Sequence, residues 1–211
     1  METQVLPASD PNALQQALAL IRQGRPVAFP TDTVYGLGCL ATDAAGIDRL
    51  YEIKEREAAK AIAVLLSSSE QLPQVAAGLG EMAGRFARRF WPGPLTLVVY
   101  RSEALPDNIS QAQVNGKPTI GLRMPDHPVA LTLIQAAGPL AVTSANLSGE
   151  PSTTTAEEVL DQLGGRIALV LDGGRTPGGA SSTVVDCTGQ RPVILRPGPV
   201  SEADLLAALK Q

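Results

Sequence analysis

Apolar residues recur every three to four positions in several stretches of this chain, the spacing that places them on one face of an α-helix. The first stretch follows Ser9-Asp10-Pro11, a capping sequence with proline in the first turn, and ends at Gly24. The same pattern, with its own start and stop residues, predicts helices that begin close to residues 10, 43, 80, 128, 155 and 201. The second helix is expected to present Lys54 and Arg56 at an exposed C-terminal end that faces a cleft.

Short apolar runs bounded by turn residues predict the strands. They lie at residues 26–29, 61–66, 95–100, 119–123, 140–143, 167–171, 183–186 and 193–196. Helices and strands alternate irregularly and show no repeat of fixed period, which favours an α/β fold of the α+β type, with a twisted, mixed sheet and helices packed on it. At roughly 100–200 residues per domain, we expect residues 1–211 to form a single domain.

Composition and charge narrow the class of protein. Apolar residues make up 44% of the chain and charged residues 18%, so a mostly disordered protein is excluded. A net charge of −4 and a pI near 5.1 argue against a protein that mainly coats nucleic acid, because that role needs a basic face. No apolar run approaches the roughly 20 residues that span a bilayer, and the N-terminus does not resemble a secretory signal. We therefore expect a cytoplasmic protein without a membrane segment.

Cysteine and histidine are too sparse for several kinds of site. Cys39 and Cys187 lie far apart without Cys-x-x-Cys spacing, a pattern more typical of buried small apolar residues than of a disulfide or metal pair. His127 is the only histidine in the sequence. A histidine-based metal site or a Ser-His-Asp triad is therefore not expected, and we predict no metal site built by the protein.

Four polar segments stand at predicted strand or helix ends, where side chains can converge on one cleft. They are residues 30–38 (Pro-Thr-Asp-Thr-Val-Tyr-Gly-Leu-Gly), the cations Lys54, Arg56 and Lys60, residues 143–149 (Thr-Ser-Ala-Asn-Leu-Ser-Gly), and residues 181–186 with 194–198. Cations can clamp polyphosphate, and hydroxyl and amide donors can hold phosphate or carboxylate oxygens. Each segment alone also has a structural explanation, such as a self-capped turn or a solvated basic helix end.

In this order, and with Trp91-Pro92-Gly93-Pro94-Leu95-Thr96 and residues 121–128 between them, the segments resemble the YrdC/Sua5 family of threonylcarbamoyl-adenylate synthases. The resemblance covers about residues 12–200. It implies a YrdC-like three-layer fold, in which helices flank a mixed parallel and antiparallel sheet, and the short form that consists of the YrdC domain only.

The resemblance also implies an activity. Such an enzyme forms threonylcarbamoyl-AMP and pyrophosphate from L-threonine, bicarbonate and ATP, for the N6-threonylcarbamoyl modification of adenosine 37 in tRNA. Mg2+ is expected to accompany ATP. A downstream threonylcarbamoyl transferase complex and tRNA are the further partners that it implies.

The resemblance assigns roles to individual residues. It places the catalytic positions at Lys54, Arg56, Ser144 and Asn146. It places ATP contacts at these four and at Lys60, Thr119, Thr154 and Arg196. It places the threonine contacts at Thr31, Thr33, Arg123, Ser144 and Ser182, and an arginine is a natural two-point partner for an amino-acid carboxylate.

The chain also departs from the family pattern. Glu57 and Ala61 stand where the family usually has proline, and Leu65 stands where some relatives carry a polar residue near threonine. These positions keep two alternatives open. One is a YrdC-like paralogue that acts on a different substrate, and the other is an RNA-binding or ribosome-associated factor of the same fold.

Overall fold

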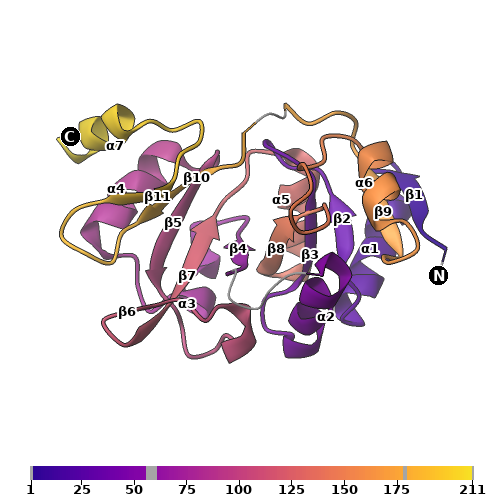
Figure 1. Ribbon diagram of the computed structural model, residues 1–211, viewed down its shortest axis with the longest axis horizontal. Coiled ribbons are helices and arrows are strands. Elements are labelled where there is room, and N and C mark those ends of the chain that lie inside the picture. The colour runs from indigo at the N-terminus through magenta and orange to yellow at the C-terminus, as the bar shows by residue number, and fades with distance from the viewer. Residues whose placement is uncertain (1, 56–60, 178–179, 211) are drawn as a thin grey trace.

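The computed structural model describes residues 2–55, 61–177 and 180–210. Its centre is a mixed sheet in the order β1-β9-β2-β3-β8-β4-β7-β5-β10-β11, with β6 paired to β7. In chain order the strands are β1 (Gln4–Pro7), β2 (Val27–Phe29), β3 (Gly36–Leu40), β4 (Ala63–Leu65), β5 (Leu95–Tyr100), β6 (Gln113–Val114), β7 (Lys117–Arg123), β8 (Leu140–Ser144), β9 (Leu169–Asp172), β10 (Thr183–Asp186) and β11 (Val193–Arg196). Strands β1 and β11 are the two ends of this order, and Figure 1 shows them at opposite ends of the molecule.

The helices begin at residues that can cap them. Asp10 accepts a hydrogen bond from the backbone of Asn12 at the start of the first helix, and Ser201 forms a complete capping box with Asp204 at the last. The α-helices are α1 (Pro11–Arg22), α2 (Ala44–Lys54), α3 (Leu72–Val75), α4 (Gly80–Phe90), α5 (Pro128–Ala137), α6 (Ala156–Leu163) and α7 (Glu202–Leu209), and the short 3-10 helices are η1 (Ser69–Gln71) and η2 (Asp107–Ile109). None of the described helices is long and apolar enough to cross a membrane.

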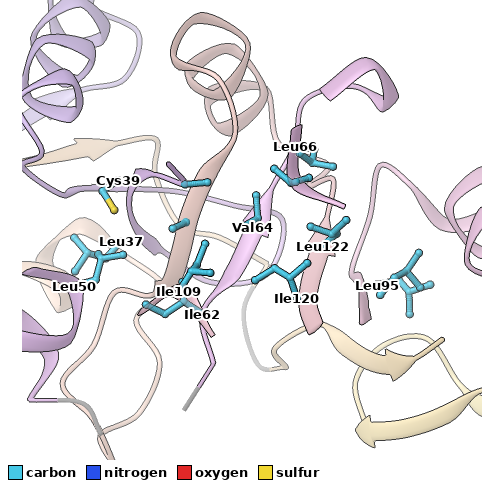
Figure 2. Packing of buried hydrophobic residues seen from close by; sticks show 14 of the residues in the cluster. Leu37, Cys39, Leu50, Ile62, Val64, Leu66, Leu95, Ile109, Ile120 and Leu122 are labelled. Atoms are coloured by element: carbon cyan, nitrogen blue, oxygen red, sulfur yellow. The ribbon is translucent and has the colours of Figure 1, made fainter. Parts of the chain in front are cut away.

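Helices cover both faces of the sheet, which confirms the predicted layers. In β2, Val27 and Phe29 belong to a core cluster with residues of α1 and α5, whereas Ala28 belongs to the cluster on the other face. This alternation follows from the two-residue period of a strand. Figure 2 shows part of the second, larger cluster, where Leu50 of α2 lies beside Leu37 and Cys39 of β3.

All the predicted helices and strands are confirmed, with small shifts at their ends. The predictions missed β1, β6 and the short helices α3, η1 and η2, and they gave no bounds for β3, which begins within the polar segment of residues 30–38. In β1, only Leu6 is more than slightly protected from solvent, because this strand lies at the sheet edge and pairs with β9 alone among the described strands. Its position is fixed by long-range contacts such as the bond from Thr3 Oγ1 to the carbonyl of Ile167 (2.6 Å), which no local pattern announces.

Helices α1 and α5 cover only part of their face of the sheet. Their cluster includes residues of β2, β4, β8 and β9, but none of β5, β7 or β10. On this side β5 presents Thr96 and Val98 to a cavity, whereas Leu95, Leu97 and Val99 point into the larger cluster on the opposite face. The uneven cover therefore leaves room for a site over the middle of the sheet.

Candidate functional site

The cavity over the central strands has a volume of about 490 Å³. This volume lies within the range of roughly 300–1,000 Å³ that is typical of small-molecule sites. Apolar residues form part of its wall, and hydroxyl groups from separate parts of the chain line the rest: Thr31, Thr33, Thr96, Ser110, Thr119, Thr143, Ser144, Ser181 and Ser182. A site of this kind offers many weak donors and acceptors to an oxygen-rich ligand.

Arg123, at the end of β7, is the one charged residue in the described lining of this cavity that is buried. It is 6% exposed, and its guanidinium is held by three groups. Nε donates to the carbonyl of Gly93 (3.0 Å), Nη1 donates to Oγ1 of Thr33 (3.0 Å), and Nη2 forms an ion pair with Asp32. The guanidinium therefore has a fixed orientation before any ligand arrives.

The segment before β3 is folded around the hydroxyl of Thr31. Its Oγ1 donates to the carbonyl of Val34 (2.6 Å) and accepts from the backbone N–H of Thr33 (3.2 Å). Thr31 and Thr33 are both almost fully buried and both line the cavity, with their hydroxyl oxygens 3.1 Å apart. The predicted self-capped turn is thus present, and it also brings two hydroxyl groups to the site.

Elsewhere in the lining, the hydroxyl group of Thr96 in β5 and that of Ser182, which precedes β10, meet an arginine. Oγ of Ser182 lies 2.8 Å from Oγ1 of Thr96, and Nη2 of Arg196 donates to Oγ of Ser182 (3.1 Å). Arg196 also donates to the carbonyl of Ser182 through Nε (3.1 Å). Ser182 and Arg196, predicted to contact threonine and ATP respectively, both line the cavity, and the exposed Arg196 is at its rim.

Lys54 has a different setting from the one predicted. It is 1% exposed, and its Nζ donates to the carbonyls of Ser144 and Asn146 and, at 3.5 Å, to Oδ1 of Asn146. The backbone N–H of Ser148 in turn donates to the carbonyl of Lys54 (3.0 Å). The prediction of an exposed Lys54 is therefore wrong, because the segment after β8 covers the end of α2 and its carbonyl oxygens satisfy the buried ammonium group.

Of the predicted pair Ser144 and Asn146, only Ser144 is in the described lining of the cavity. Ser144 ends β8 and lines the cavity. Asn146 is buried, and its Nδ2 donates to the carbonyls of Leu147 (2.7 Å) and Glu150 (2.8 Å). Asn146 therefore folds the turn that follows Ser144.

Two other predicted ATP contacts, Thr119 and Thr154, lie in different parts of the structure. Thr119, in β7, lines the cavity and its hydroxyl donates to the carbonyl of Ala112 (3.2 Å). Thr154 is outside the described lining, and its Oγ1 donates to Glu158 (3.0 Å) and accepts from Arg175 (2.8 Å). These bonds tie the segment before α6 to the one after β9.

Three residues named in the sequence analysis lie outside the described residues: Arg56, Glu57 and Lys60. The other two departures from the family pattern, Ala61 and Leu65, both line the cavity. They contribute apolar surface to it.

A scan against known protein families finds a match over most of the chain. The model Sua5_yciO_yrdC, described as "Telomere recombination", matches residues 19–198. The chain belongs to the Sua5/YciO/YrdC family. The resemblance drawn from the ordered motifs is thereby confirmed.

Named members of the Sua5/YciO/YrdC family match most of the chain. A Bacillus subtilis (strain 168) protein named threonylcarbamoyl-AMP synthase is 43% identical over 208 residues, which are 98% of this chain and 59% of that protein. A structure of P. abyssi Sua5 complexed with L-threonine superposes with a TM-score of 0.91 at 40% identity, covering 98% of this chain and 61% of that one. E. coli YciO gives a TM-score of 0.84 at 26% identity, covering 96% and 98%.

The coverage values also show how much of each relative the comparison concerns. The chain spans about three fifths of the length of the B. subtilis and P. abyssi relatives. The similarity therefore concerns the part of those proteins that has the Sua5/YciO/YrdC fold.

The sequence analysis did not assign a role to several residues in or beside the cavity. Thr96 and Thr143 line the cavity, and Asp32 holds Arg123. Strand alternation could have identified Thr96, because it places this side chain on the face opposite Leu95 and Leu97. No local signal pairs Asp32 with a residue 91 positions away.

Tyr35 lies in the lining of the cavity and ties two segments of the chain together. Its hydroxyl donates to the carbonyl of Gly174 (2.8 Å) and accepts from the backbone N–H of Gly173 (3.2 Å). Burial, together with the nearby charge of Asp172, raises the pKa of Tyr35 to about 12. Tyr35 is therefore neutral at physiological pH and joins β3 to the end of β9.

The described residues contain no group of three or more His, Cys, Asp or Glu side chains that could hold a metal ion. Oxygen ligands supplied by a phosphate-bearing substrate remain suited to Mg2+, which commonly keeps several waters and needs few protein ligands.

Proposed function

We propose that this chain is a threonylcarbamoyl-AMP synthase, which joins L-threonine, bicarbonate and ATP and releases pyrophosphate. The observation that carries the proposal is the cavity in which Arg123, held rigidly, shares a wall with hydroxyl groups from three separate motifs. Relatives that bear this name support it, as does the P. abyssi structure that contains L-threonine. We propose further that residues 1–211 form one YrdC-like domain.

The proposed chemistry needs alignment and charge neutralisation more than a protein nucleophile. The amine of threonine adds to CO2 and loses a proton, or condenses with bicarbonate and loses water, to give a carbamate. A carbamate oxygen then attacks the α-phosphorus of ATP, and the bond to the bridging oxygen of the β-phosphate breaks to release pyrophosphate. Arg123 takes the carboxylate of threonine, and Thr31, Thr33 and Ser182 provide hydroxyl groups beside it. Ser144 lies where the two substrates meet.

The nucleotide is assigned to the remaining part of the family site. We propose that Arg56, Lys60, Thr119, Thr154 and Arg196 contact ATP. Lys54 and Asn146 act through the segment that follows β8, because their side chains are bonded to it. Mg2+ enters with ATP, held by phosphates and waters. The product serves tRNA modification by a downstream transferase in the cytoplasm.

The activity test is the release of pyrophosphate by purified protein with ATP and Mg2+. We expect release only when L-threonine and bicarbonate are both present, because the attacking oxygen belongs to the carbamate made from them. Omission of either substrate is the control. Pyrophosphate release that does not depend on threonine would contradict the proposed function.

A paralogue with another substrate is the alternative that a specific observation keeps open. Ala61 and Leu65, two of the departures from the family pattern, both line the cavity. A screen of the amino acids for bicarbonate-dependent pyrophosphate release distinguishes the two functions. Faster release with an amino acid other than L-threonine would favour the paralogue.

A further inference from the structure

The ion pair between Asp32 and Arg123 joins two segments that are far apart in the sequence. The side chain of Arg123 is 7% exposed and that of Asp32 is 12% exposed. Two charges at this depth attract each other more strongly than on the surface, and each would be costly if left alone. The pair therefore fixes the position of Arg123, which lines the cavity.

The other two bonds of Arg123 determine which edge of the guanidinium a ligand can use. The carbonyl of Gly93 occupies Nε, so a carboxylate cannot bind across Nε and a terminal nitrogen. Thr33 takes one N–H of Nη1, and Asp32 takes one N–H of Nη2. An arginine has five N–H donors, so one N–H on each terminal nitrogen is uncommitted among the described residues.

We propose that Asp32 is a positioning residue for substrate binding: its carboxylate holds Nη2 of Arg123 so that the terminal edge of the guanidinium faces the cavity and receives the substrate carboxylate on two points. Two-point binding depends on the direction of the fork as well as on its charge. The identity of the substrate as threonine rests on the proposed function above.

The test is calorimetric binding of L-threonine and of ATP, each measured on its own, to the full chain and to Asp32→Asn. We expect the variant to bind L-threonine about tenfold more weakly or worse, since the ion pair with Arg123 becomes a weaker hydrogen bond to an uncharged amide. The affinity for ATP should stay within about twofold, because Asp32 acts only on the arginine. A loss of fold would instead weaken both ligands.

Asp126→Asn is the matched control. Asp126 is exposed and lies close to Arg123 in the sequence, but it makes no described bond to Arg123. Its substitution removes the same charge as Asp32→Asn does. We expect both affinities to stay within about twofold of the unmodified protein. A loss of threonine binding in this control equal to that in Asp32→Asn would overturn the proposal, because general charge would then explain it.

A second arm asks whether Asp32 works through Arg123. In an Arg123→Lys background, Asp32→Asn should change threonine binding by less than about twofold, since the fork that Asp32 positions is absent. An undiminished effect there, or a threonine affinity of Asp32→Asn equal to or tighter than that of the unmodified protein, would overturn the inference.

If Asp32→Asn fails to fold, Asp32→Glu takes its place. The longer side chain keeps the charge but moves the carboxylate, so threonine binding should weaken about threefold or more while ATP binding is retained. Unchanged threonine binding would overturn the inference. Failure of the unmodified protein to bind L-threonine at all would contradict the proposed function, and this inference with it.

Discussion

At the scale of single residues, the site depends on buried polar groups that are satisfied by the backbone. Lys54 illustrates this at the end of α2, where its ammonium group meets the carbonyls of Ser144 and Asn146. A cation near a helix C-terminus also benefits from the helix dipole. Lys54 therefore contributes to stability as well as to the shape of the segment after β8.

The first prediction concerns Lys54→Met, which keeps the aliphatic length and removes the ammonium group. We expect the free energy of unfolding to fall by about 2–5 kcal/mol, because buried carbonyls that lose their donor cost about 1–3 kcal/mol each. Urea denaturation measures it. Lys210→Met, at an exposed position, is the control and should change the value by about 0.5 kcal/mol or less. Equal effects in the two variants would contradict the burial of Lys54.

At the scale of elements, the close packing of β3 on its neighbours explains the glycines of residues 36–38. Strand β3 pairs with both β2 and β8. A Cβ built on Gly36 would lie 2.8 Å from Cγ1 of Val142, and one on Gly38 would lie 2.9 Å from Cγ2 of the same side chain. Glycine therefore leaves the space that Val142 fills beside the cavity.

The second prediction is that Gly38→Ala lowers the free energy of unfolding by about 1–3 kcal/mol, the usual cost of overpacking a well-filled core. Thermal or urea unfolding measures it. Gly189→Ala provides the comparison, because the nearest atom to its added Cβ is at an ordinary contact distance of 3.8 Å. A Gly38→Ala protein as stable as this control would show that Val142 can move aside.

The third prediction concerns His127, which precedes α5. Burial lowers the pKa of His127 below its usual 6.5, although the nearby charges of Asp32 and Asp126 act in the opposite direction. The unfolded chain therefore binds the proton more readily, so the contribution of His127 to stability is complete above pH 6.5 and is lost as the pH falls below that value.

Urea denaturation of the unmodified protein and of His127→Gln, at about pH 7.5 and about pH 5.5, measures this contribution. We expect the unmodified protein to lose more stability than the variant over this interval. Parallel losses in the two proteins would mean that His127 titrates normally in the fold.

At the scale of the whole molecule, a net charge of −4 accompanies a sheet whose two faces are unequally covered. The open part of one face forms the cavity, and its volume of about 490 Å³ suits small molecules. The apolar clusters on both faces hold this surface in place. The net negative charge disfavours a nucleic acid bound along a face, whereas the cavity and its buried Arg123 suit a small anionic group bound locally.

The fourth prediction follows from this charge. We expect filter retention of unmodified tRNA by the protein, at about 0.15 M salt, to be no greater than retention by an acidic control protein of similar size. Retention that is strong at low salt and falls steeply with added salt would instead support the RNA-binding alternative.

Much of the fold was predictable because its signals are local. The start of helix α4 and both ends of strand β5 were predicted as the structure has them, from apolar spacing and from the prolines and glycine between the two elements. The edge strand β1 was missed because its partner β9 lies more than 160 residues further along the chain. Of the site, Arg123, Thr33 and Ser182 were predicted, whereas the role of Asp32 was not.

The sequence by itself determined most of the segments that become helices and strands, and the order of motifs that places the chain in the Sua5/YciO/YrdC family. Only the tertiary structure decided which polar side chains face the cavity. Lys54 meets Ser144 across 90 positions of sequence, and Asp32 meets Arg123 across 91. Spacing along the chain sets the face of one helix or strand, but the burial and partners of a charge depend on how distant elements pack, which no local pattern contains.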